Sequence, residues 1–270
     1  MVKNLLKYEC AAAWRSLLPV RLAVIGVAAL LRLLQIFETD TAVYDIVFGS
    51  GVAALIIASL TCLVLTAGVA IIRFYRHLFT SQGYLTLSLP VREETHIFTK
   101  LTVAVGSTLL SLLVLILGVM IATAGEALNE LCNAAAYLLR ALVNVMPSTG
   151  WMLLQFALFC ILAVAAFYLL TYACITVGQM AKRARIWAAI GVFFGYYFIT
   201  QIFSTVLLIR LTVTDGEGMP LFEQLLEQLD VDPAGFVHNS LWIGIAVTAL
   251  LGGIYFLVAR VLMKRRLNVE

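Results

Sequence analysis

The sequence predicts an all-α integral membrane protein with six transmembrane helices and both termini on the cytoplasmic side. Of its 270 residues, 63% are hydrophobic and only 12% are charged, whereas soluble domains are about half apolar and about a quarter charged. The apolar residues gather into six runs of about 20 residues or more, the length that crosses a hydrocarbon core. Lys and Arg residues fall almost entirely into alternate connecting segments, which is typical of a multi-pass membrane protein.

Six apolar runs define the spans within a single transmembrane domain. A more polar stretch, residues 1–16, precedes the first run and is expected to form a short helix on the inner membrane surface, with Trp14 at the headgroup level. The fourth run is longer than a bilayer requires, so we expect it to tilt or to extend into the cytoplasm. The spans are expected at about 17–37, 47–72, 101–124, 151–180, 186–208 and 241–262.

Three longer segments connect the spans. Residues 73–100 form an inner loop, in which a proline is expected to end one helix before another begins. Residues 125–147 repeat apolar side chains at helical spacing, which predicts an amphipathic helix on the outer surface. Residues 210–239 are expected to hold a second amphipathic outer helix, ended by Pro233 and Gly235.

Charge sets the expected topology. With both termini inside, the outer segments hold only Arg140 and Arg210 among the 18 Lys and Arg residues. Arg21 and Arg32 lie within the first span, where we expect their side chains to extend toward the headgroups. The alternative is an intramembrane charge that lines a substrate path. All other basic residues lie in or beside inner segments, which predicts cytoplasmic termini.

Motifs of the common enzyme classes are absent from the sequence. It contains no Gly-x-x-x-x-Gly-Lys-Ser/Thr loop for nucleotides, no His-Glu-x-x-His for zinc and no Gly-x-Ser-x-Gly nucleophile turn. His77 and His96 lie in the inner loop with no Cys or carboxylate at metal-ligand spacing, so we expect them to be solvated or to face a partner. We therefore expect no catalytic residue, cofactor site or metal site in this chain.

Few polar residues fall within the spans. A proton- or sodium-coupled transporter places ionisable groups near the bilayer midplane, and such groups are scarce here. The scarcity indicates that any transport is driven by energy supplied from outside the chain. The polar residues expected in mid-span are Thr61, Ser107, Ser111, Gln155 and Gln201.

Small residues mark two possible helix-packing faces. Gly191 and Gly195 form a Gly-x-x-x-Gly pair in the fifth span, and Gly244 and Gly252 lie on one face of the sixth. Because a glycine lets two helices approach closely, we expect these faces to contact other helices.

The inner loop carries the clearest resemblance to a known family. Its sequence RFYRHLFTSQGYLTLSLPV (73–91), followed by a helix into the third span, resembles the ABC type-2 permease family, in the small six-span membrane subunits of Gram-positive bacterial ABC exporters. The stretch YACITVGQMAKRAR (172–185) is similar to that group's Gly-Gln pattern before basic residues, and the tail 263–270 resembles its basic ending. The resemblance covers essentially the whole chain.

This resemblance implies a permease subunit in the bacterial cell membrane that moves a substrate outward. Its partners are then a second permease, identical or paralogous, and ABC ATPase subunits that carry the ATP and Mg, with no cofactor in this chain and no nucleic acid. In the family, the loop between spans two and three docks on the ATPase. The ATPase-coupling residues carried over are Tyr84, Leu85, Leu87, Leu89, Pro90, Arg92, Glu93 and Glu94.

Three questions stay open at this point. Glu93 and Glu94 suit the positive end of the following helix as well as they suit a docking contact. The aromatic run 193–198 suits an amphipathic peptide, such as an antimicrobial peptide, or a lipid-like substrate, and equally suits ordinary lipid contact. The alternative function is a membrane sensor or signalling subunit of a peptide-resistance or detection module, with a kinase in place of the ATPase.

Overall fold

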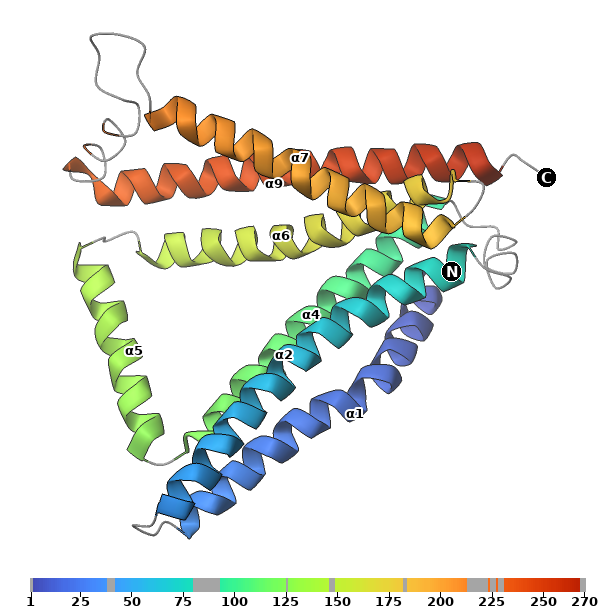
Figure 1. Cartoon of the computed structure of the whole chain (residues 1–270). Helices are drawn as coiled ribbons and strands as arrows, with labels where there is room; N and C mark the ends of the chain where they lie inside the picture. The colour runs from blue at the N-terminus through green and yellow to red at the C-terminus, as the bar shows by residue number, and fades with distance from the viewer. Residues whose placement is uncertain are drawn as a thin grey trace. The chain divides into compact units, whose positions relative to one another are not determined.

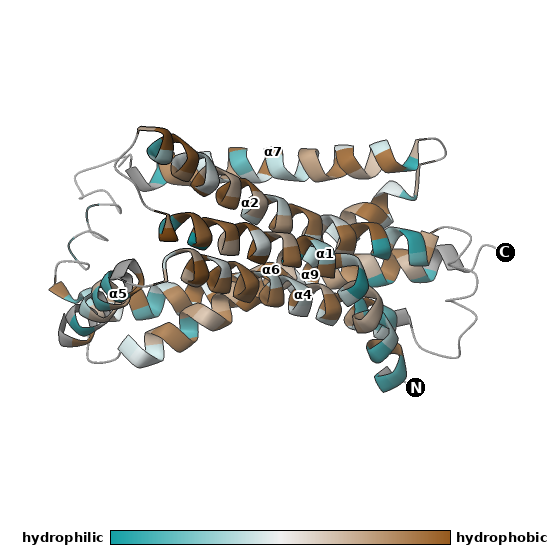
Figure 2. Cartoon of the chain, turned by 90° about the horizontal axis from the view of Figure 1, so that it is seen from below, coloured by the Kyte–Doolittle hydropathy of each residue, from teal (hydrophilic) through white to brown (hydrophobic). Residues whose placement is uncertain are grey.

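The computed structural model describes residues 2–37, 42–79, 93–124, 126–145, 149–181, 184–212, 223, 227 and 231–267. All regular elements in these ranges are α-helices, and six of them are long and apolar enough to cross a membrane. Hydrophobic residues extend along these helices (Figure 2), so the prediction of an all-α protein with six membrane-spanning helices is confirmed. The helices are α1 (Val2–Ile36), α2 (Ala42–Phe79), α4 (Glu93–Ala122), α5 (Glu126–Val145), α6 (Thr149–Gly178), α7 (Arg185–Thr212) and α9 (Pro233–Leu267).

The chain divides into two compact units, Met1–Leu138 and Leu139–Glu270. In the first unit, α1, α2 and α4 pack against one another (Figure 1). Close approach depends on small residues, since a Cβ added to Gly118 of α4 would lie 3.3 Å from the Val24 side chain of α1. The core of this unit consists of Val24, Ala28, Leu31, Leu55, Cys62 and Ala122.

In the second unit, α6 packs against both α7 and α9. The C-terminal half of α6 is buried, with Tyr168 and Tyr172 almost fully enclosed. A Cβ added to Gly178, the last residue of α6, would lie 2.6 Å from the backbone of Ala189 on α7. Glycine at this position is therefore what allows the two helices to meet at their connection.

The first helix differs from the sequence-based expectation. Residues 1–16 and 17–37 were expected as an interfacial helix followed by a span, and the structure has one continuous helix from Val2 to Ile36. Pro19 lies inside it, where a proline removes one backbone hydrogen bond and crowds the preceding turn, and the helix continues through this position. At 1.5 Å per residue the helix is about 52 Å long, so it extends well beyond a hydrocarbon core of about 30 Å.

The last helix also begins earlier than expected. Pro233 and Gly235 were expected to end an outer helix, whereas the structure places them in the first turn of α9. The Asp232 carboxylate accepts a hydrogen bond of 2.9 Å from the Gly235 backbone N–H, which caps the helix. Proline is favoured directly after such a cap because that position needs no N–H donor.

The two other connecting segments are described in part. A new helix begins at Glu93, three residues after the proline of the inner loop, and α5 occupies the range of the first expected outer helix. The position of α5 on a membrane surface stays a prediction, as does the cytoplasmic location of the termini. Most of the second expected outer helix lies outside the described residues.

Candidate functional site

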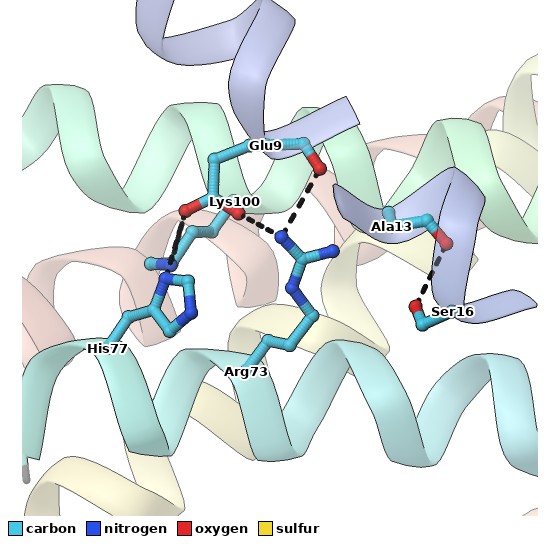
Figure 3. Close-up of polar contacts among 6 residues, drawn as sticks. All are labelled: Glu9, Ala13, Ser16, Arg73, His77 and Lys100. Atoms are coloured by element: carbon cyan, nitrogen blue, oxygen red, sulfur yellow. Dashed lines mark hydrogen bonds and ion pairs between the residues drawn. The ribbon is translucent and has the colours of Figure 1, made fainter. Parts of the chain in front are cut away.

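One carboxylate gathers basic side chains from two other helices in the first unit. Glu9 of α1 accepts a hydrogen bond of 2.7 Å from Nη2 of Arg73 and one of 2.9 Å from Nζ of Lys100. Nδ1 of His77 lies 3.2 Å from the same carboxylate (Figure 3). We call Glu9, Arg73, His77 and Lys100 the Glu9 cluster. It joins the ends of α1, α2 and α4 through charge-assisted contacts.

The spacing of the basic residues explains how the cluster forms. Arg73 and His77 are four residues apart on α2, and His96 and Lys100 are four residues apart on α4, so each pair lies on one helix face. Glu9 is the only acidic residue in the sequence before position 38. A single acid on one helix and a basic pair on each of two others was a signal that sequence reasoning missed.

The Glu9 cluster is largely enclosed. The exposed fractions of its Glu9, Arg73 and Lys100 side chains are 12%, 17% and 5%. Charges in such surroundings are screened weakly, so each depends strongly on its partners. Two cations surround one carboxylate, so the Glu9 cluster carries a surplus of positive charge.

His96 lies beside the cluster and differs from its expected placement. The sequence predicted a solvated or partner-facing side chain, and the structure buries His96 to 1% exposure. Its Nε2 has no hydrogen-bond partner among the described residues. The fold explains the error, because His96 belongs to α4, a helix that packs against both α1 and α2. Within the described ranges, no group of three His, Cys, Asp or Glu residues is arranged to hold a metal ion.

A second polar group lies further along the same three helices. Arg21 of α1 donates through Nε to Oγ of Ser111 at 3.1 Å and through Nη2 to the carbonyl of Ser107 at 2.8 Å. Ser111 and Thr66 of α2 share a hydrogen bond of 2.9 Å. We call Arg21, Thr66, Ser107 and Ser111 the Arg21 group. It connects α1, α4 and α2 by buried hydrogen bonds.

The structure encloses Arg21 among the helices, and the expectation that its side chain reaches the level of the headgroups stays a prediction. The residue is only 4% exposed, and its guanidinium lies 5.7 Å from the centre of the Trp14 ring. An arginine over an aromatic face gains a cation–π contact. The side chain therefore turns into the helical unit, where the Ser111 hydroxyl and the Ser107 carbonyl accept its hydrogen bonds.

The second unit has polar contacts of another kind, built from aromatic and amide groups. Gln155 of α6 is 2% exposed and lies 3.1 Å from Nδ1 of His238 on α9. With its amide oxygen turned toward the indoles, Gln155 accepts from Trp242 at 2.6 Å and from Trp151 at 3.3 Å. The hydroxyls of Tyr196 and Tyr255 share a hydrogen bond between α7 and α9.

The predicted coupling residues are placed only in part. Glu93 and Glu94 form the first turn of α4, which agrees with their expected position at a helix start and leaves a docking contact as a prediction. The remaining coupling residues, Tyr84, Leu85, Leu87, Leu89, Pro90 and Arg92, lie outside the described residues.

The predicted packing glycines occupy two different environments. A Cβ on Gly244 would lie 3.2 Å from the Phe159 ring, and one on Gly252 would lie 3.8 Å from Leu169, so both face α6. A Cβ on Gly191 or Gly195 would meet no described atom within 4 Å. Packing at Gly191 and Gly195 stays a prediction.

Comparisons of the chain with protein-family models, with curated proteins and with solved structures found no match. We therefore infer function from the geometry of the described residues. That geometry joins three membrane-spanning helices at the Glu9 cluster, directly beside the segment that connects α2 to α4.

Proposed function

We propose that this chain is the membrane subunit of an ATP-driven exporter, in which a separate ABC ATPase docks on the inner segment 80–92. Six long apolar helices support membrane transport or sensing as the general class. The sequence lacks a nucleotide-binding loop, so a partner chain must supply the energy. A second permease, identical or paralogous, completes the assembly, and the cargo is an amphipathic peptide or a lipid-like molecule.

The Glu9 cluster is the observation that carries this proposal. The segment 80–92 begins directly after α2 and ends directly before α4. Arg73 and His77 lie in the last two turns of α2, and Lys100 lies two turns into α4. Glu9 therefore connects the two helix ends that receive any force applied to the segment. This connection makes α1, α2 and α4 move together under that force.

Helix ends that are joined to one another suit a two-state transporter. An isolated helix end that is pushed can fray, because its last turns lack hydrogen-bond partners. When three ends share a buried carboxylate, the force is instead transmitted along the helices. ATP binding to the partner then shifts the packing of the helical units between inward-facing and outward-facing arrangements.

The docking role of the inner segment is tested by charge substitution. The variant L87D/L89D should abolish stimulation of the partner's ATPase, because apolar contacts are lost, while leaving membrane insertion intact. The matched control is L225D/L229D, with the same chemistry in the segment predicted to lie outside; it should retain full stimulation. ATPase activity of the co-purified complex in nanodiscs is the measurement.

The identity of the partner decides between the two function classes. A soluble chain that co-purifies with this protein and carries the Gly-x-x-x-x-Gly-Lys-Ser/Thr loop supports the exporter. Normal stimulation in L87D/L89D rejects the docking assignment. Co-purification of a histidine kinase without any ATPase rejects the exporter and favours a sensor subunit.

A further inference from the structure

A cavity of about 260 Å³ lies between α1 and α4 of the first unit. Apolar side chains form most of its wall, including Ala13, Val103 and Leu110, and the Arg21 side chain lines it. Trp14 and Gly106 border it and are exposed. The cavity therefore lies at the surface of two helices that are long and apolar enough to cross a membrane.

Among the described residues, no carboxylate pairs with the Arg21 side chain that lines this cavity. Glu9, the acidic residue of α1, already pairs with Arg73 and Lys100. Arg21 uses its Nε and one Nη2 hydrogen bond on Ser111 and Ser107. A guanidinium has five N–H donors, so further donors remain for a ligand.

We propose that this cavity binds an anionic phospholipid of the bilayer, with its phosphate on Arg21 and part of an acyl chain against the apolar wall. A guanidinium matches the oxygens of a phosphate with two parallel hydrogen bonds. Trp14, 5.7 Å from that guanidinium, is the residue type that marks the headgroup level of a membrane. Lipid is also the molecule that a surface cavity of a membrane-spanning helix meets at the highest concentration.

The surrounding charges favour an anionic headgroup over a zwitterionic one. Arg15 lies exposed one residue beyond Trp14, and the Glu9 cluster carries its surplus of positive charge on the same end of α1. A choline group would find no free carboxylate among the described residues near the cavity. The site does not depend on the chain being part of an exporter, because all residues that line it belong to the first unit.

The test measures which lipid stays on the protein. The full chain is placed in nanodiscs that contain equal amounts of phosphatidylglycerol and phosphatidylcholine with identical acyl chains. After extraction into mild detergent, mass spectrometry counts the retained lipids per chain. The wild-type chain should retain phosphatidylglycerol about fivefold over phosphatidylcholine, the preference expected from one basic residue at a membrane surface.

Three variants separate the charge from the cavity. R21Q should abolish the preference. G106L should lower the retention of both lipids, because its side chain fills the cavity. Open space around the Gly106 Cβ means that this substitution does not force the helices apart. The control G26L lies on α1, also in open space and away from the cavity lining, and should behave as wild type.

A second measurement reports on the cavity without detergent. Cys10 borders the cavity and is exposed, so a chain with Cys10 as its single cysteine can be alkylated there. Phosphatidylglycerol discs should slow this alkylation relative to phosphatidylcholine discs. The proposal is overturned if the wild-type chain retains both lipids equally, or if G106L matches G26L. It is also overturned if inorganic phosphate slows alkylation in phosphatidylcholine discs as strongly as the anionic lipid does.

Discussion

The two units of this protein hold three helices together by different means. In the first unit, buried charge and hydrogen bonds join α1, α2 and α4 at the Glu9 cluster and again at the Arg21 group. In the second unit, close packing at Gly178 and contacts between aromatic and amide groups connect α6, α7 and α9. Loss of one ion-pair partner destabilises the first arrangement, because the other charge stays buried without a counter-charge. A change in side-chain volume or shape at the helix contacts destabilises the second arrangement.

The largest effect is expected from removing the Glu9 charge. E9Q leaves Arg73 and Lys100 enclosed without a counter-charge, which should destabilise the first unit by about 3–5 kcal/mol. The thermal unfolding midpoint of the purified chain in nanodiscs is the measurement. The double variant E9Q/K100Q should recover part of the loss. An unchanged midpoint in E9Q would show that the Glu9 cluster contributes nothing to stability.

A smaller loss of stability is expected from adding side-chain volume at a tightly packed position of the second unit. G178A places a Cβ 2.6 Å from the Ala189 backbone, which should cost about 1–3 kcal/mol. The matched control is G253A in α9, where a Cβ meets no described atom within 4 Å. This control should be neutral or slightly stabilising, since Ala favours a helix over Gly. Equal midpoints for the two variants would contradict a packing limit at Gly178.

The smallest effect is expected from a single hydroxyl of the second unit. Y255F removes the hydrogen bond to Tyr196 between α7 and α9 and should cost about 1 kcal/mol, the usual net value of one neutral hydrogen bond. S111A in the first unit should cost more than Y255F, because it removes the two hydrogen bonds that the Ser111 hydroxyl shares with Arg21 and with Thr66. The reverse order of the two unfolding midpoints would reject the contrast between the units.

The sequence predicted correctly those features that depend on the length and hydropathy of a segment. Length and hydropathy predicted six helices, and each of the six overlaps its expected span. Reasoning from local signals placed some boundaries wrongly. Pro233 and Gly235 are typical of helix ends, and only the hydrogen bond from Gly235 to Asp232 identifies them as the start of α9. Residues 1–16 are polar enough to suggest an interfacial helix, yet they continue into the span without interruption.

The sequence by itself determined the class of this protein, because the free energy of transferring long apolar helices into lipid depends mainly on composition and length. It did not determine which polar residues meet. Glu9 lies 64 residues before Arg73 and 91 before Lys100, and Arg21 lies 90 before Ser111. Such contacts depend on which helix faces pack together, and helix packing in a membrane follows shape and hydrogen bonding rather than hydrophobicity. Tertiary structure therefore decided that Arg21 and His96 are buried and that one carboxylate joins three helices.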